Sequence, residues 1–245
     1  MGDVTDMEEI VLRAEDVSVY YGGLKAVEGV TLELQRGQIR GLIGPNGAGK
    51  STVIDAITGR RRLTRGQVQI LGKDVTSLDV VERRRCGLSR SFQRTSIFSH
   101  MSVYKQVELA SSKMGMKDPG ADAQAVLREL DLWGSAGTMA HDLGYGEQRR
   151  LDLALALVGR PSVLLLDEPM AGLSVQESQE LARHLKKLTE TWDVSVLLVE
   201  HDMDVVFGIS DAITVFELGH VIASGSPTDV RSNPRVREAY LGSAA

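Results

Sequence analysis

The sequence predicts an α/β fold in which a parallel-sheet core is joined to an antiparallel β subdomain and a helical subdomain. From residue 163 onward, buried-strand patterns alternate with a helical pattern, over Val163–Leu166, Gln176–Thr191 and Val194–Val199. Such alternation is typical of a parallel, doubly wound sheet. Residues 10–39 instead show short apolar runs broken by glycine, and residues 100–160 show helical spacing.

Length and composition set limits on this prediction. The chain has 245 residues, of which 42% are hydrophobic and only 4% aromatic, so we expect one globular unit with a mostly aliphatic core. The net charge of −5 makes nucleic acid a poor partner. Cys86 is the single cysteine, which excludes an intrachain disulfide. The acidic start lacks the pattern of a secretory signal, and no apolar run approaches the roughly 18–20 residues that span a bilayer.

The N-terminal third is predicted to supply most of the antiparallel strands. Val17–Tyr20, Val30–Leu34 and Gln67–Leu71 are half-apolar runs that we expect to lie beside the parallel-sheet core as an antiparallel sheet. Ile39–Ile43 is fully apolar and predicts a buried strand, whereas Val53–Ile57 predicts a helix.

A complete phosphate-binding motif stands between that strand and that helix. The pattern G-x-x-x-x-G-K-[ST] is spelled by Gly44, Pro45, Asn46, Gly47, Ala48, Gly49, Lys50, Ser51 and Thr52. Glycines let backbone N–H groups converge on a polyphosphate, and the start of a helix adds its positive dipole end. We expect Lys50 to reach the β- and γ-phosphates and Ser51 to ligate Mg²⁺.

A second set of polar residues follows buried strands farther along the chain. Asp167 and Glu168 end the strand that begins at Val163, and ligands bind beyond the carboxyl ends of parallel strands. Asp167 is expected to hold Mg²⁺ and Glu168 to orient the attacking water and accept its proton. His201 follows another buried strand, where it could contact the γ-phosphate or be a surface residue. Gln93 could ligate Mg²⁺ or be an ordinary polar residue.

The helical part of the chain carries a weaker signal. Ala123–Leu132 and Gln148–Val158 have helical spacing, and His141–Gln148 opens the second of these helices. Gly146 would permit close approach of an anion to the helix start, although an ordinary helix cap explains the same residues.

Together these motifs resemble the ATPase subunit of an ABC transporter. The resemblance runs from about residue 10 to 242 and identifies Gly44–Thr52 as Walker A, Gln93 as the Q-loop glutamine and His201 as the switch histidine. It identifies Val163–Glu168 as Walker B and Leu143–Glu147 as the signature segment, in which Gly144, Tyr145, Gly146 and Glu147 would contact nucleotide. Tyr21 resembles the aromatic residue that stacks on adenine, with Tyr20 as the alternative.

The resemblance also implies an organisation. Residues 10–92 and 161–225 would form the nucleotide-binding core with its β subdomain, 93–160 the helical subdomain and 226–245 a C-terminal tail, all in one ABC ATPase domain. Two such subunits, identical or related, would enclose two ATP molecules with Mg²⁺ between Walker motifs and the partner's signature. The partners implied are membrane permease subunits and a solute-binding protein. The subunit would lie in the cytoplasm on the inner face of the cell membrane.

Details of the motifs narrow the subgroup. The pattern Leu-x-Tyr-Gly-x-Gln, the segment Glu200–Met203 and the ending Asn233–Gly242 resemble the ATPases of branched-chain amino acid importers, a group that also moves other amino acids, urea and amides. The signature Gly-Glu pair and Ser96–Phe98 also resemble a lipopolysaccharide-export ATPase. A soluble ABC ATPase is the other alternative, although the single cassette and missing heptad run argue against it. Ser174 departs from the family pattern, which has Asp there, as do Gly144 and Tyr145, where Ser and Gly are usual.

Three further sets of residues have an open interpretation. The basic runs Arg60–Arg62 and Arg83–Arg85 predict a solvated face or contact with a membrane partner. The apolar set Ile97, Phe98, Met101 and Val103 predicts either a permease-docking surface or part of the helical core. Residues 203–207 predict core packing.

Overall fold

The computed structural model describes residues 9–91 and 95–238. Its centre is a six-stranded sheet in the order β10-β9-β3-β8-β7-β6. The strands β9, β3, β8, β7 and β6 run parallel, and β10 pairs antiparallel with β9. The bounds of these strands are β3 Ile39–Ile43, β6 Leu88–Ser91, β7 Val163–Asp167, β8 Ser195–Val199, β9 Ala212–Glu217 and β10 His220–Gly225.

A second sheet of four antiparallel strands lies beside the first, in the order β2-β1-β4-β5. Its strands are β1 Ile10–Tyr21, β2 Leu24–Gln35, β4 Arg65–Ile70 and β5 Lys73–Asp74. The predicted strands Val17–Tyr20 and Val30–Leu34 fall within β1 and β2, and Gln67–Leu71 matches β4 except for its last residue, so the predicted antiparallel sheet is confirmed. The parallel core is confirmed as well.

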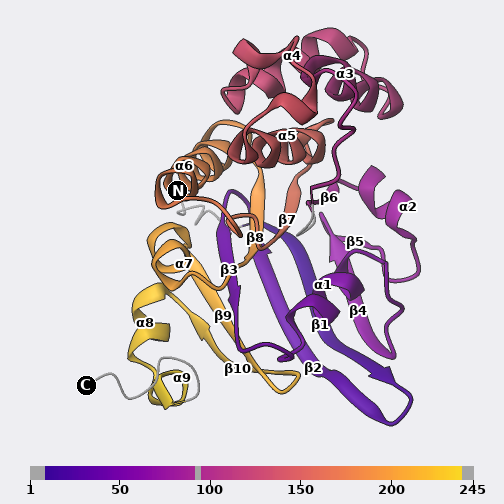
Figure 1. Cartoon of the computed structure of the whole chain (residues 1–245). Helices are drawn as coiled ribbons and strands as arrows, with labels where there is room; N and C mark the ends of the chain where they lie inside the picture. The colour runs from indigo at the N-terminus through magenta and orange to yellow at the C-terminus, as the bar shows by residue number, and fades with distance from the viewer. Residues whose placement is uncertain (1–8, 92–94, 239–245) are drawn as a thin grey trace, which may run out of the picture.

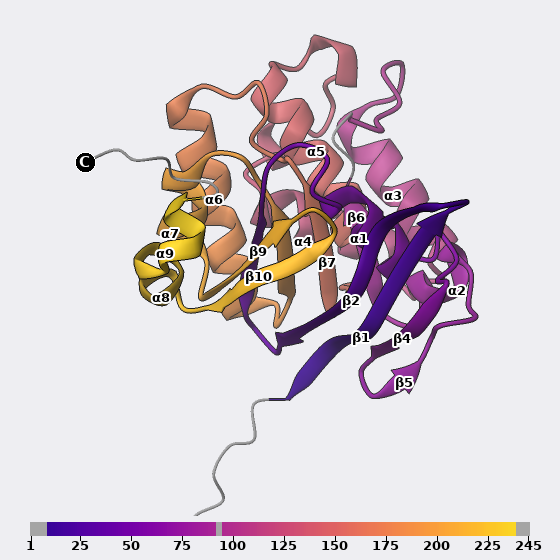
Figure 2. The ribbon, with the colours of Figure 1, turned by 90° about the horizontal axis from the view of Figure 1, so that it is seen from below.

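Helices cover both faces of the parallel sheet (Figure 1). Figure 1 shows α3 and α4 stacked beyond α5 at one end of the molecule, while the antiparallel sheet lies at the other. Seen from below, α6 to α9 lie at the side opposite β5 and α2 (Figure 2). The helices are α1 Lys50–Ile57, α2 Val80–Arg85, α3 Val103–Lys113, α4 Pro119–Glu129, α5 Tyr145–Leu157, α6 Val175–Thr191, α7 Met203–Ile209, α8 Pro227–Ser232 and α9 Pro234–Val236, with 3₁₀ turns at Trp133–Ser135 and Ala140–Asp142.

Two aliphatic cores result from the alternation of side chains along the central strands. In β7, Leu164 and Leu166 pack with α3 to α6, whereas Val163 and Leu165 pack with α1 and the antiparallel sheet. Successive residues of a strand point to opposite faces, so one apolar run feeds both cores. Helix α1 therefore lies between the two sheets and is held by Val53 and Ile54 among others. This burial places the start of α1 at the edge where the parallel strands end.

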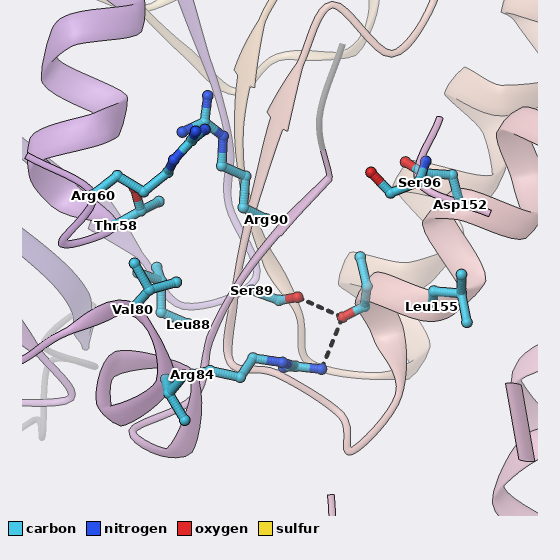
Figure 3. Close-up of a pocket in the computed structure, with 12 residues that line it drawn as sticks. Thr58, Arg60, Val80, Arg84, Leu88, Ser89, Arg90, Ser96, Asp152 and Leu155 are labelled. Carbon is cyan, nitrogen blue, oxygen red and sulfur yellow. Dashed lines mark hydrogen bonds between the residues drawn. The ribbon is translucent and has the colours of Figure 1, made fainter. Parts of the chain in front are cut away.

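The basic run Arg83–Arg85 corrects one expectation. Arg83 is only 2% exposed, and its guanidinium donates to the carbonyl oxygens of Ala56 and Ile57 at 2.8 and 2.6 Å, at the end of α1. Arg84 donates to the carbonyl oxygens of Ala156 and Val158 at the end of α5. Figure 3 shows the Arg84 side chain reaching from α2 toward α5. Neither side chain belongs to a solvated face, because both cap helix ends whose carbonyls lack helical partners. Helix α2 thereby links the helix after the phosphate loop to α5.

Several other expectations from the sequence can be compared with the structure. Val103 is fully buried, Ile97 packs against the helical core, and Phe98 is 60% exposed, so the apolar set around it serves partly as core. Val206 is buried as expected. Within the predicted C-terminal tail, α8 and α9 are helical as far as Val236. Within the described ranges, no helix has the length and apolar character needed to cross a bilayer. The division into core, helical subdomain and tail stays a prediction.

Candidate functional site

The phosphate-binding motif forms a tight turn between β3 and α1. Gly44 has φ 153°, and a Cβ there would lie 2.3 Å from the carbonyl oxygen of Phe216. Gly49 caps α1 with φ 103°, and a Cβ there would lie 2.8 Å from the carbonyl oxygen of Ala26. Both positions require glycine for conformation and for space. The turn is therefore pressed against two neighbouring hairpins and leaves its other side open.

Lys50 lies inside this turn. Lys50 is only 6% exposed, and its Nζ donates to the carbonyl oxygens of Gly44 at 2.6 Å and Pro45 at 3.0 Å. Burial lowers the pKa of Lys50, and the nearby carboxylates of Glu168 and Asp167 partly offset this. The ammonium group is thus held by two neutral oxygens, which an anionic ligand would outcompete.

A cavity of about 330 Å³ opens beside the turn. The described residues that line it come from five separate segments of the chain: Leu24, Lys25 and Ala26; Asn46, Gly47, Ala48, Gly49, Lys50, Ser51 and Thr52; Glu168; His201; Leu218 and Gly219. The structure therefore brings the phosphate loop together with Glu168 and His201, as the sequence predicts. The hairpin residues at 24–26 and 218–219 were not predicted, and the only sequence signal for them is a glycine-containing turn beside each.

Glu168 and His201 contact each other in the lining of this cavity. The Oε1 of Glu168 lies 2.8 Å from Nε2 of His201, and the two side chains are 23% and 39% exposed. The backbone of Glu168 has φ 50°, a left-handed conformation that costs energy in a residue other than glycine. Its N–H donates to the carbonyl of Val199, and its own carbonyl accepts from Arg149. These bonds hold the strained turn and aim the carboxylate into the cavity.

Glu200 is a further site residue that the sequence analysis did not single out. Its buried carboxylate accepts from the N–H groups of Met170 at 2.7 Å and His201 at 3.0 Å. Burial raises the pKa of Glu200, and these hydrogen bonds act in the opposite direction. One side chain therefore joins the loop after Glu168 to the loop that carries His201. A charged residue at the end of an apolar strand is the signal that could have found it.

Asp167 lies at the same strand end but is engaged elsewhere. Its Oδ2 accepts from Arg90 at 2.8 Å, and Arg90 also contacts Asp55 of α1 at 2.5 Å. Asp167 is not among the described lining residues of the cavity. Gln93, which the sequence assigns to the same metal, lies outside the described residues.

The segment Gly144–Glu147 lies apart from the phosphate loop. The Tyr145 hydroxyl donates to the carbonyl of Ala171 at 3.1 Å, and a Cβ at Gly146 would lie 2.4 Å from Oε1 of Glu177. Glu147 accepts from the Ser135 hydroxyl at 2.9 Å. Among the described residues, no member of this segment lines the 330 Å³ cavity. Within one chain, the structure does not bring the predicted signature to the predicted ATP site.

The predicted adenine-stacking residue lies at the end of β1. Tyr21 is 40% exposed, and the Arg61 guanidinium lies over its ring, 4.6 Å from the centroid. Tyr20, the alternative, donates its hydroxyl to Glu28 at 3.1 Å. Tyr21 therefore has the more accessible ring, with Arg61 over one of its faces.

The phosphate-binding turn between β3 and α1 lies at the end of a parallel sheet and shares its cavity with the carboxylate of Glu168 and the imidazole of His201. This arrangement defines the chain as a P-loop nucleoside-triphosphatase. The sequence profile of ABC transporters matches residues 27–171, and the profile of branched-chain amino acid ATP-binding cassette transporters matches residues 220–245. The chain belongs to the ABC transporter family, and it is an ATP-binding ATPase coupled to transport.

Curated relatives cover almost the whole chain. It is 37% identical to the high-affinity branched-chain amino acid transport ATP-binding protein LivG of Salmonella typhimurium, over 97% of this chain and 100% of the relative. It is 36% identical to the corresponding protein BraF of Pseudomonas aeruginosa, with the same coverage. Among solved structures, it resembles a nucleotide-free ATP-binding cassette from an ABC transporter, with a TM-score of 0.85, 28% identity and coverage of 95% and 99%.

Proposed function

We propose that this chain is the ATP-hydrolysing subunit of a membrane importer for branched-chain or other amino acids, or for related small polar solutes. The observation that carries the substrate class is the match of residues 220–245 to branched-chain amino acid cassettes. The names of the full-length relatives support the same class. Permease subunits and a solute-binding protein would complete the transporter, with this chain on the inner face of the membrane.

In this proposal, the phosphate loop binds the phosphates of ATP. Lys50 would exchange its two carbonyl partners, at 2.6 and 3.0 Å, for phosphate oxygens. The loop N–H groups and the start of α1 add further donors. Tyr21 would stack on adenine with the ring face that Arg61 does not cover.

The oxygen donors of Ser51 and Asp167 fit Mg²⁺. They are a hydroxyl and a carboxylate, and Mg²⁺ characteristically combines one or two carboxylates with substrate phosphates. Gln93, which lies outside the described residues, would add an amide oxygen. When bound, Mg²⁺ would neutralise charge on the transferred phosphoryl group. Asp167 must turn one oxygen toward the metal for this role, since Oδ2 is paired with Arg90.

Glu168 is the proposed general base and His201 its partner. The 2.8 Å contact between Glu168 Oε1 and His201 Nε2 holds the carboxylate at the mouth of the cavity. A carboxylate in this position can orient a water molecule and accept its proton. His201 would then contact the γ-phosphate.

Two subunits are needed for a complete site in this proposal. Gly144, Tyr145, Gly146 and Glu147 lie away from the chain's own phosphate loop, which supports contact with ATP on a second subunit. The second subunit would be another copy or a related chain. ATP binding would close the pair, and hydrolysis with product release would open it.

Copurification tests the transporter assignment. The tagged chain would be isolated from detergent-solubilised membranes of its native host, with the untagged host as control, and its companions identified. Permease subunits encoded with a solute-binding protein for amino acids or amides are expected. Envelope lipid-export proteins would instead support the exporter, and a preparation with no membrane protein would contradict the proposal.

The dimer is tested separately. Purified Glu168→Gln protein is expected to form dimers when ATP is added, because ATP would stay bound without being hydrolysed. The Lys50→Ala/Glu168→Gln protein is the matched control and should remain monomeric. A strict monomer of Glu168→Gln at high concentration, under conditions in which ATP binding is measured, would contradict a homodimer and leave a related partner chain.

A further inference from the structure

Arg90 joins two carboxylates that come from different parts of the chain. It lies in β6, and its side chain is only 9% exposed. One guanidinium nitrogen lies 2.5 Å from Oδ1 of Asp55, and the other lies 2.8 Å from Oδ2 of Asp167. The planar fork of a guanidinium can satisfy two acceptors at once in a fixed orientation. The three residues form a cluster with two negative charges and one positive charge. Arg90 and Asp167 are largely buried in it, whereas the Asp55 side chain is 33% exposed.

The neighbours of this cluster belong to the nucleotide site on one side and to a groove on the other. Asp55 is one turn and a half along α1 from Lys50, while Asp167 directly precedes Glu168. Arg90 also lines a cavity of about 330 Å³ with α2 and α5 residues such as Val80 and Leu155. In Figure 3 its guanidinium lies next to that of Arg60, and Arg60 approaches the same Asp55 oxygen at 3.8 Å.

The geometry creates a competition for Asp167. A divalent cation that uses this carboxylate meets an oxygen already paired with a buried positive charge. Two cations near one carboxylate repel each other, most strongly where little water screens them. Asp55 acts in the opposite direction, because it draws the same guanidinium toward α1.

We propose that Arg90 is a positioning residue for the Asp167 carboxylate and that, together with Asp55, it sets how much Mg²⁺ the nucleotide site requires. This inference rests on the proposed Mg²⁺ role of Asp167. Removal of the Arg90 charge frees Asp167 for the metal. Removal of the Asp55 charge leaves Arg90 with Asp167 as its main carboxylate and strengthens the competition.

The test is a Mg²⁺ titration of nucleotide binding. Purified protein is mixed with a fluorescent, non-hydrolysable ATP analogue, and binding is followed as MgCl₂ is added to an EDTA-treated sample. The midpoint of the Mg²⁺ dependence should fall about tenfold in Arg90→Met, the scale of one buried charge near the metal. It should rise about threefold in Asp55→Asn, a smaller effect because Asp55 acts through Arg90. A disruption of structure alone would shift both midpoints upward.

The control variant is Arg13→Met, which removes one positive charge from an exposed ion pair with Glu33 at 2.8 Å. Its midpoint should equal that of the wild type. Midpoints that move in the same direction for Arg90→Met and Asp55→Asn, or that do not move, would overturn the inference. If Arg90→Met does not fold, an unchanged or lowered midpoint in Asp55→Asn overturns it alone.

The wild-type titration separates this inference from the proposed function. Analogue binding that does not respond to Mg²⁺ in the wild type would overturn the metal role of Asp167 and the inference with it. A clear response in the wild type, without opposite shifts in the two variants, would overturn the role of Arg90 and leave the proposed metal site intact.

Discussion

The phosphate loop and the signature segment are both glycine-containing turns that open a helix, yet their surroundings differ. Gly44–Lys50 turns its free side to a 330 Å³ cavity, and only its back is pressed against neighbouring hairpins. At Gly144–Glu147, side chains of the same subunit occupy the turn: Glu177 lies against Gly146, and Tyr145 reaches Ala171. The comparison indicates that one chain can bind a polyphosphate at the first turn, while the second is held by its own neighbours.

Substitution of Glu168, the proposed general base beside the phosphate loop, should give the largest effect, a loss of ATP hydrolysis. Glu168→Gln keeps the shape of the side chain but removes the proton acceptor. Hydrolysis should fall about 10²-fold or more, the usual scale for loss of a positioned base. ATP binding, measured by fluorescence titration, should stay close to that of the wild type. Turnover near the wild-type rate would remove Glu168 from this role.

Removal of the lysine should weaken ATP binding at the same turn. Lys50→Ala deletes a charged donor that is poised beside the cavity, and such bonds contribute about 1.5–3 kcal/mol. The dissociation constant for ATP should rise about tenfold to a hundredfold. Lys105→Ala, which removes a lysine from an exposed pair on α3, is the control and should bind normally. An unchanged constant for Lys50→Ala would contradict the phosphate-loop assignment.

A larger side chain at Gly146 in the signature segment should lower the stability of the fold without changing nucleotide binding. In Gly146→Ala the new methyl group meets Glu177, whose other carboxylate oxygen is held by Ser174 at 2.7 Å. We expect a loss of about 1–2 kcal/mol in the free energy of unfolding, typical of mild overpacking. Urea unfolding measures this loss, and ATP binding to the isolated subunit should be unchanged.

Two further variants act as controls for this substitution. Gly208→Ala adds a methyl group in α7 where, apart from the neighbouring residues and backbone of its own helix, no heavy atom lies within 4 Å, so it should not destabilise the fold. The cost of Gly146→Ala should shrink in a Glu177→Ala background, because the crowded atoms are then absent. An equal cost in both backgrounds would contradict the proposed contact.

Loss of the tyrosine hydroxyl should give the smallest effect. Tyr145→Phe removes one hydrogen bond, of 3.1 Å, to the carbonyl oxygen of Ala171, and Tyr145 is 47% exposed. The free energy of unfolding should fall by about 1 kcal/mol or less. A loss well above 2 kcal/mol would show that Tyr145 supports the loop after Glu168 more than this contact suggests.

Local patterns predict the elements of the fold well. The apolar run Ile39–Ile43 predicts β3 with the observed bounds, and the helix predicted at Val53–Ile57 is α1, which begins at Lys50 directly after its cap Gly49. The helix predicted at Gln148–Val158 begins earlier in the structure, at Tyr145, because Gly144 and Glu147 form its cap. Boundaries differ where a cap, rather than an apolar pattern, starts the helix.

Contacts between distant residues could not be predicted in the same way. Arg83 looks like part of a charged surface run, but it is buried because the carbonyls of Ala56 and Ile57 need donors. Arg90 is 77 residues from Asp167 in the sequence and Glu200 is 30 from Met170, so no local pattern pairs them. Each depends on which strands become neighbours in the sheet.

The sequence by itself determined the phosphate loop, the strand-end carboxylates Asp167 and Glu168 and the alternation that makes a parallel sheet. These features are local, because they follow from residue spacing, glycine conformation and the period of the apolar residues. Only the tertiary structure decided that Glu168 meets His201, that Arg90 holds Asp167 and that the signature segment lies away from the cavity. Those outcomes depend on strand order and on which buried polar groups find partners, and both are set only when the whole chain packs.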